Sequence, residues 1–225
     1  MSHGKQFTLY SHKGGPNGWK VAFLLEELGL TYETKYLNFQ AGEHKSPEFL
    51  KINPNGRIPA LIDHKNNDYI VWESNAILLY LVDKYDTEKK FTVTEESDKY
   101  HLIQWLFFQA SGQGPYYGQA FWFLNYHPEK VDSAVDRYKN EIRRVLGVLE
   151  SVLSKQSWLV GNKYTIADLS FLTWNESVTG AIFKDDPDFD FEKNYPSVAK
   201  WHNTVRNRPA IKKCWDLRAQ LLSQH

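Results

Sequence analysis

The residues best suited to bind a charged small molecule lie at a predicted junction between a strand and a helix. Residues 69–71 predict a strand because they are aromatic or β-branched, and Ser74 predicts the N-cap of a helix that continues to Tyr85. The N–H groups of a helix's first turn attract anions, whereas the carboxylate of Glu73 attracts a cation. Glu73 and Ser74 therefore suit the amine and carboxylate of an amino-acid head group. The alternative interpretation is an ordinary hairpin followed by a capped helix.

A second candidate feature is Pro59, near the start of another predicted strand at residues 57–62. Proline has no N–H to donate to a ladder, so it lies at an edge or a turn. If the Ile58–Pro59 bond is cis, the neighbouring backbone is open to a peptide ligand. Ligands of open α/β sheets bind at the carboxyl ends of strands, so we expect the loops after other strands to converge here. The polar candidates in those loops are Ser11, Asn17 and His44.

Composition excludes several classes of protein. The 27 basic and 27 acidic residues balance, so bulk charge indicates neither a nucleic acid nor a membrane surface as partner. No apolar run approaches the roughly 18 residues of a spanning helix, and the first residues lack the apolar core of a signal peptide, so we expect a cytoplasmic protein. The single cysteine, Cys214, excludes an internal disulfide and is expected to be packed. The eight histidines lack metal-ligand spacing, so we predict no metal.

The chain begins with a predicted crossover unit, which would carry several of these side chains. Residues 7–11 predict a strand, Asn17 predicts the N-cap of a helix that Gly29 closes, and residues 31–37 predict a second strand. A short helix follows at residues 47–50, ahead of the hairpin and helix described above. This order predicts an α/β domain with a mixed four-stranded sheet and helices on its faces.

The second half of the chain predicts only helices. Residues 86–98 are charged and indicate a linker. We expect helices at 100–126, interrupted at 111–115, and at 131–153, then one opened by a capping box at 165–168, and two more at 195–207 and 210–222. The predicted domains are 1–87 and an all-α domain at 98–225, joined by residues 88–97.

Several motifs together carry a resemblance to a known family. They are Asn53-Pro54-Asn55-Gly56-Arg57-Ile58-Pro59-Ala60-Leu61, Glu73-Ser74-Asn75-Ala76-Ile77, and Trp158-Leu159-Val160-Gly161 ahead of Thr165-Ile166-Ala167-Asp168. The chain resembles the glutathione transferase superfamily over nearly its whole length. Its first loop and the residues around Trp105 are similar to the fungal branch related to the yeast prion-forming nitrogen regulator, and to the bacterial nu class of disulfide-bond oxidoreductases. The resemblance implies a thioredoxin-like first domain, with glutathione as co-substrate, and a homodimer.

The resemblance also implies roles for single residues. Glu73 and Ser74 would hold the γ-glutamyl amine and carboxylate, and the Ile58 backbone, before a cis-Pro59, would pair with the cysteinyl backbone as an added strand. His44 would contact the glycine end, and Asn17 would face the sulfur. Two arginines complete the set that the resemblance places in the glutathione site, Arg57 and Arg137.

Asn17 decides the chemistry that the resemblance implies. A thiol with a pKa of about 8.5 is mostly protonated at neutral pH, and an amide N–H at a helix N-terminus stabilises the thiolate. Because asparagine cannot form a mixed disulfide, any disulfide exchange would use the sulfur of glutathione itself. A plain N-cap is the alternative role for Asn17, and Ser11 is an alternative partner for the thiolate.

The function favoured by the resemblance is a glutathione-dependent disulfide-bond reductase or thiol transferase. Its second substrate would be a disulfide or a small hydrophobic molecule. Three alternatives remain: a transferase that conjugates glutathione to hydrophobic electrophiles, a glutathione-binding regulatory module that acts through a protein partner, and a ligandin-like carrier.

Overall fold

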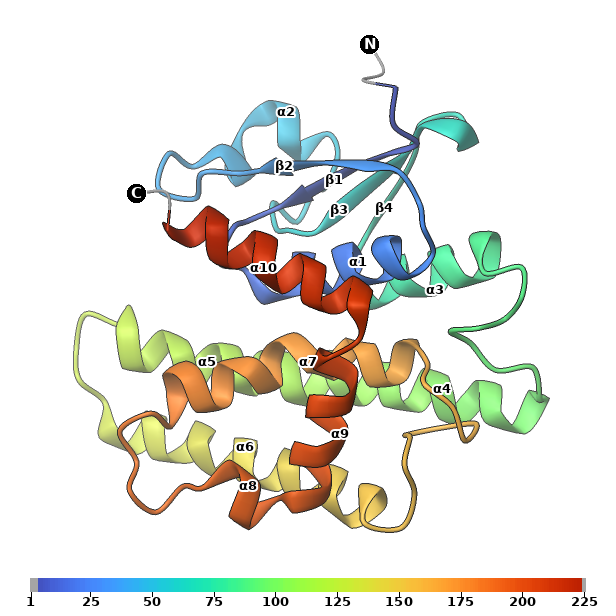
Figure 1. Ribbon diagram of the computed structural model, residues 1–225. Helices are drawn as coiled ribbons and strands as arrows, with labels where there is room; N and C mark the ends of the chain where they lie inside the picture. Colours follow the sequence, from blue (N-terminus) through green and yellow to red (C-terminus); the bar gives the residue numbers. More distant parts are fainter. Residues whose placement is uncertain (1–3, 224–225) are drawn as a thin grey trace. The chain divides into compact units, whose positions relative to one another are not determined.

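The structure is a computed structural model that describes residues 4–223 (Figure 1). Contacts divide this part of the chain into two compact units, one formed by residues 4–89 and 207–223 and the other by residues 90–206. Among the described helices, none combines the length and the apolar character that crossing a membrane requires.

The first unit is built on a mixed four-stranded sheet with the order β2-β1-β3-β4. Strand β1 (Phe7–Ser11) runs parallel to β2 (Tyr32–Tyr36) and antiparallel to β3 (Ala60–Asp63), which forms a hairpin with β4 (Tyr69–Trp72). The predicted mixed sheet is confirmed. The helices of this unit are α1 (Pro16–Glu27), η1 (Glu43–Lys45), α2 (Pro47–Leu50), η2 (His64–Asn66), α3 (Ser74–Tyr85) and α10 (Pro209–Ser223).

Alternate side chains of β1 face two different layers of the first unit. Phe7 contacts Tyr85 of α3, with 5.4 Å between ring centroids, and α1 lies beside α3 along the same face (Figure 1). Tyr10 points the other way, because side chains alternate along a strand, and contacts Phe49 of α2 at 5.4 Å. Phe7 and Leu9 are fully buried, so the core of this unit lies between β1 and the α1–α3 layer.

Helix α1 begins earlier than its sequence signals predicted. Gly15 is its N-cap and Pro16 its first residue, so the predicted N-cap role of Asn17 is wrong. Proline suits the first helical position because its fixed φ is already helical and it needs no N–H partner there. At the other end, Gly29 has a φ of 65°, which confirms the predicted glycine closure.

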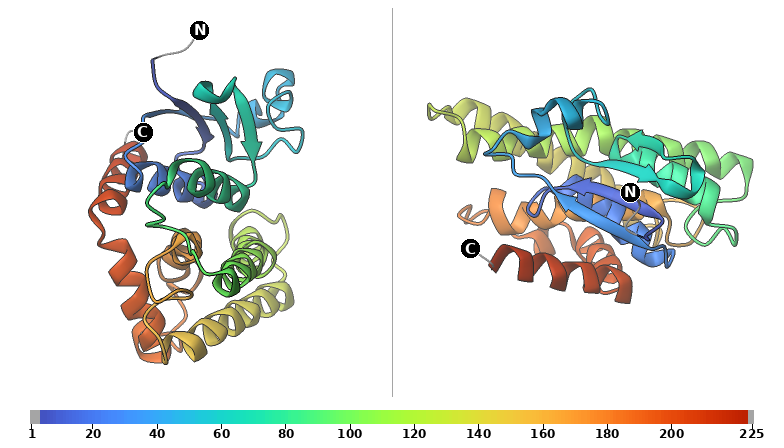
Figure 2. Two further views of the ribbon diagram at one scale, coloured as in Figure 1. Left: turned by 90° about the vertical axis from the view of Figure 1, so that its right-hand side faces the viewer. Right: turned by 90° about the horizontal axis from the view of Figure 1, so that it is seen from above.

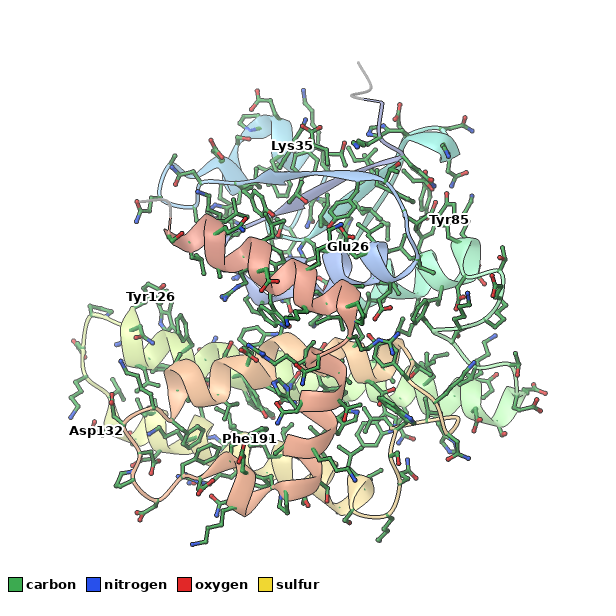
Figure 3. The ribbon with its side chains drawn as sticks, viewed as in Figure 1. Glu26, Lys35, Tyr85, Tyr126, Asp132 and Phe191 are labelled. Carbon is green, nitrogen blue, oxygen red and sulfur yellow. The ribbon has the colours of Figure 1, made fainter. Side chains whose placement is uncertain are left out.

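The last helix, α10, packs on α1 and so belongs to the first unit. Trp215 contacts the ring of Phe23 at 5.2 Å, and Lys213 lies 2.7 Å from Glu26 of α1, which Figure 3 labels. Arg208 pairs with Glu27 across a sequence separation of 181 residues. The sequence had placed residues 207–223 in the helical domain, whereas these contacts join them to α1. The remaining domain limits, at 87 and 98, stay predictions.

The second unit is helical, as predicted. An interruption was expected at residues 111–115. Residues 109–113 instead form a π-helical turn, and the helices on either side run on as one long rod (Figure 2). Thr165 caps its helix through the predicted capping box with Asp168. The segments of this unit are α4 (Glu96–Phe108), η3 (Gln109–Gln113), α5 (Gly114–Asn125), α6 (Asp132–Leu153), α7 (Ile166–Ser177), η4 (Val178–Ile182), α8 (Phe191–Asn194) and α9 (Pro196–Arg206).

Candidate functional site

The junction between β4 and α3 differs from its prediction by one residue. Strand β4 ends at Trp72, and Glu73 turns the chain into α3 with a φ of 71°, a left-handed conformation that is uncommon outside glycine. Glu73 is therefore the N-cap, and the prediction that Ser74 caps α3 is wrong. Ser74 is the first helical residue, so its side chain does not have the N-cap role.

Lys20 of α1 lies beneath this junction, and sequence reasoning missed it. Its side chain is 1% exposed, and its Nζ donates a hydrogen bond to Ser74 Oγ at 3.3 Å. Burial lowers the pKa of Lys20 to about 7, and the carboxylate of Glu73 opposes that shift. The sequence signal was present, because Lys20 is the one charged residue within the buried run at residues 18–25.

The N-terminus of α1 lies directly on the end of β1. A Cβ added to Gly18 would be 1.9 Å from Ser11 Oγ, a contact that only glycine permits. Ser11 is buried, and Asn17 is half-buried in the first turn of α1. Lys20 follows Asn17 by three residues, so these two side chains are neighbours on the helix surface. The structure thus brings together two predicted candidates and the missed lysine.

Three rings in tilted contact lie at the first loop. The centroids of His12 and Phe39 are 4.6 Å apart, and those of Phe39 and His44 are 4.3 Å apart. Burial lowers the pKa of both histidines, and the charges of Lys45 and Arg57 lower the pKa of His44 further. His44 was a predicted site residue, whereas His12 was not singled out.

The loop before β3 is held by Asn53, which is 2% exposed. Its amide nitrogen donates to the carbonyl of Arg57 at 2.7 Å, and its Oδ1 accepts from the backbone of Asn55 at 3.0 Å. The Ile58–Pro59 peptide bond is cis. Because the β1–β3 ladder ends at the pair Tyr10–Ala60, the backbone of Ile58 lies beyond it.

Contacts of two glycines connect these loops. A Cβ on Gly15 would lie 3.3 Å from the side chain of Ile58, and a Cβ on Gly56 would lie 2.9 Å from the carbonyl of His44. Ile58 therefore lies beside the loop that precedes Asn17, and His44 lies beside the loop that carries Arg57, Ile58 and Pro59. Exposed Arg57 and Lys45 leave this region positively charged beside His44.

Two predicted residues lie elsewhere in the fold. Arg137 is on α6 in the second unit, where its side chain is 68% exposed and lies 3.6 Å from Glu141, so its role in the site stays a prediction. Cys214 is buried on α10, and burial raises its pKa to about 12, which confirms the expectation of a packed cysteine.

Comparisons with known proteins give these loops a family context. The model of the glutathione S-transferase N-terminal domain matches residues 5–83, and that of the C-terminal domain matches residues 114–209. Glutathione S-transferase 2 of Schizosaccharomyces pombe is 54% identical over 233 aligned positions that cover 100% of both chains. The chain belongs to the glutathione S-transferase family.

Solved structures place this family member among the Ure2-type transferases. The transferase URE2P6 of Phanerochaete chrysosporium, in complex with oxidized glutathione, is 66% identical with a TM-score of 0.94, covering 98% of this chain and 99% of that one. Ure2p5 of the same organism, cocrystallized with 1-(S-glutathionyl)-2,4-dinitrobenzene, is 56% identical with a TM-score of 0.92 and 99% coverage of both. These neighbours confirm the predicted fungal branch and the transferase fold.

Proposed function

We propose that this transferase is a glutathione-dependent disulfide-bond reductase or thiol transferase in which Asn17 stabilises the glutathione thiolate. The observation that carries the proposal is the position of Asn17 as the second residue of α1, beside Ser11. The N–H groups of a helix's first turn have no partner within the helix and favour a negative charge nearby. A plain N-cap role, which would have explained Asn17 without function, does not apply because Gly15 is the cap.

The reaction needs no protein sulfur. The thiolate of glutathione attacks the glutathionyl sulfur of a mixed disulfide, the S–S bond breaks, and the substrate leaves as its thiolate while glutathione disulfide forms. Asparagine supplies a hydrogen-bond donor but no exchangeable sulfur, and Cys214 is buried on α10 with a raised pKa. Support also comes from URE2P6, whose structure contains oxidized glutathione, the product of this exchange.

The remaining predicted residues account for the other parts of glutathione. Glu73 and Ser74 offer a carboxylate and a helix N-terminus to the γ-glutamyl head group. The backbone of Ile58, beyond the end of the ladder, suits the cysteinyl peptide. His44 and Arg57 lie in a positively charged region that suits the glycine carboxylate. Arg137 we assign to the same site from the family resemblance alone.

The first prediction concerns Asn17→Ala. We expect reduction of a mixed disulfide of glutathione and 2-mercaptoethanol to fall about 100-fold in kcat, as when one donor to a developing anion is removed. Binding of S-methylglutathione should change little, because that ligand has no thiol to ionise. The measurements are steady-state kinetics and calorimetric titration of the same preparations.

Asn203→Ala is the matched control for this prediction. Asn203 is exposed on α9, so removing its amide should leave both measurements unchanged. Equal turnover of the Asn17→Ala variant and the unmodified chain would contradict the role of Asn17. Failure of the unmodified chain to bind S-methylglutathione would contradict the glutathione site itself.

A second candidate function is conjugation of glutathione to hydrophobic electrophiles. It is favoured by the 1-(S-glutathionyl)-2,4-dinitrobenzene found with Ure2p5, because that molecule is a conjugation product. Assaying the mixed disulfide and 1-chloro-2,4-dinitrobenzene side by side separates the two functions. Robust conjugation without disulfide reduction would reverse our ranking. A homodimer, a cytoplasmic location, and regulatory or carrier roles stay predictions.

A further inference from the structure

The buried lysine at the junction between β4 and α3 forms a hydrogen bond that has no role in the proposed reaction. Lys20 Nζ donates to Ser74 Oγ at 3.3 Å, and Ser74 is the first residue of α3. We propose that Lys20 is a positioning residue for the γ-glutamyl carboxylate: its ammonium group directs the Ser74 hydroxyl toward that carboxylate and takes up a proton as the ligand binds. This inference rests on the proposed glutathione site.

The hydrogen bond from Lys20 fixes what the Ser74 hydroxyl can do. A serine hydroxyl has one hydrogen and two acceptor lone pairs. When one lone pair accepts from Lys20, the hydrogen of Ser74 is left to point toward a ligand acceptor. A carboxylate there would receive the Ser74 O–H and the N–H groups of the first turn of α3, all as donors. The arrangement therefore selects an anion over a neutral group.

Burial makes the charge of Lys20 depend on that anion. Lys20 is 1% exposed, and taking an ammonium group out of water disfavours its charged form, which lowers its pKa to about 7. Glu73 opposes this shift, but it is also the residue expected to pair with the ligand amine. A ligand carboxylate at Ser74 adds a negative charge and so raises the pKa of Lys20. Binding of the ligand is thereby coupled to protonation of Lys20.

The other ionisable groups on elements that pack against α1 have partners or face solvent, and Tyr10 of β1 points to the opposite face, toward Phe49. On α10, Arg208 pairs with Glu27, Lys213 pairs with Glu26, Arg218 donates to the carbonyl of Gly14, and the Cys214 thiol is buried with a raised pKa. On α3, Tyr80 and Tyr85 donate to Asp63. The exposed groups are Asp83, Lys84, Lys212 and Asp216.

The experiment is calorimetric titration of the full chain with S-methylglutathione, which has no thiol to ionise. Titrations in buffers of different ionisation enthalpy give the number of protons taken up per ligand. At pH 8 we expect the unmodified chain to take up close to one proton more than Lys20→Met, and at pH 6 we expect no difference, since Lys20 is then already charged. Protons from the ligand amine cancel in this comparison.

Affinity gives a second readout. Lys20→Met should weaken binding about 10- to 100-fold at pH 6, as expected for losing a hydrogen bond to a charged group. Lys20→Arg stays charged at every pH, so it should keep more affinity than Lys20→Met and lose the difference in proton uptake between pH 6 and pH 8. Lys213→Met removes a mostly exposed lysine of the same unit and should behave as the unmodified chain.

A measurement on the unmodified chain covers the case in which the Lys20 variants fail to fold. The 4-aminobutanoyl analogue of S-methylglutathione keeps the amine and lacks only the α-carboxylate. It should bind without the extra proton uptake at pH 8. Equal uptake with both ligands, or equal uptake by the unmodified chain and Lys20→Met, would overturn the inference. Absence of S-methylglutathione binding to the unmodified chain would instead overturn the proposed function.

Discussion

The contact between Gly18 and Ser11 determines how closely α1 approaches the end of β1, and so where Asn17 lies. An added Cβ would be 1.9 Å from Ser11 Oγ and 2.8 Å from Ser11 Cβ, and Ser11 is itself buried. The hydroxyl could rotate about the Cα–Cβ bond, but Ser11 Cβ cannot move without shifting the strand end or the helix. The family chemistry proposed for Asn17 therefore depends on a neighbouring residue that has no side chain.

The second test concerns Gly18→Ala. We expect it to lower the free energy of unfolding by about 1–3 kcal/mol, because overpacking forces the strand end and helix apart. It should also reduce disulfide turnover, since Asn17 moves with the helix. Urea unfolding and steady-state kinetics measure the two effects.

Gly147→Ala provides the control for Gly18→Ala. Gly147 also lies in a helix, α6, but an added Cβ there would meet nothing within 4 Å. Alanine has the better helix propensity, so this variant should be stabilised by about 0.5–1 kcal/mol. A Gly18→Ala variant as stable as Gly147→Ala would show that the contact with Ser11 has no energetic consequence.

Candidate site residues could be predicted from the sequence where the type of side chain limits the chemistry that it can perform. Glu73, Ser74, His44 and Ile58 were selected from the sequence and the resemblance, and the structure places all four in the first unit, at helix starts, in η1 and before β3. Lys20 was missed because lysine in a helix is ordinarily solvated, and its burial depends on the packing of α1 against α3.

Among the described helices and strands, α7 has the most completely hydrogen-bonded start, because of its capping box. Asp168 is fully buried and accepts hydrogen bonds from the backbone of Leu159, from the backbone and hydroxyl of Thr165, and from Trp201 Nε1. Its two oxygens thus join the start of α7 to the turn before it and to α9. Asp168 therefore stabilises the packing of α7 against α9 as well as the start of α7.

We predict that Asp168→Asn costs about 3 kcal/mol of unfolding free energy, because one oxygen becomes a donor that faces other buried donors. Thr165→Ala should cost about 1 kcal/mol, the usual effect of losing an N-cap side chain. Chemical unfolding followed by tryptophan fluorescence measures both. Similar costs for the two variants would show that Asp168 acts only within the box.

The ends of helices could be predicted where the sequence signals that mark them are local. The helix at residues 132–153 followed from its apolar stripe, and the capping box from its spacing. The predicted N-caps of α1 and α3 were both wrong. Pro16 opens α1 and the left-handed Glu73 caps α3, whereas the sequence predicted polar residues slightly later in the chain as the caps. The π-helical turn at 109–113 keeps the chain helical where a Gly-containing segment predicted a break.

For the molecule as a whole, the sequence could not predict that α10 belongs to the first unit. Its helical pattern is local, but its partner α1 lies far earlier in the chain, and the pair Lys213–Glu26 spans 187 residues. No signal within residues 207–223 distinguishes a helix that ends the second unit from one that packs on the first. The buried residues Ile211 and Cys214 show that this packing contributes to the core.

The last prediction is that removing residues 207–225 destabilises the first unit. Losing buried Ile211 alone should cost about 2–5 kcal/mol, since such truncations leave uncompensated apolar surface. We expect amides of α1 and β1 to lose protection in hydrogen exchange, while those of α6 and α7 keep it. Removing only residues 224–225 is the control, and unchanged protection of α1 in the longer deletion would contradict the assignment.

The packing of α10 also determines when the chain can finish folding during its synthesis. Strand β1 and helix α1 leave the ribosome before the second unit does, but helix α10, which covers α1, leaves after it. The second unit, whose residues are continuous, has all its parts available earlier. We therefore expect the first unit to finish folding only after the whole second unit has been translated.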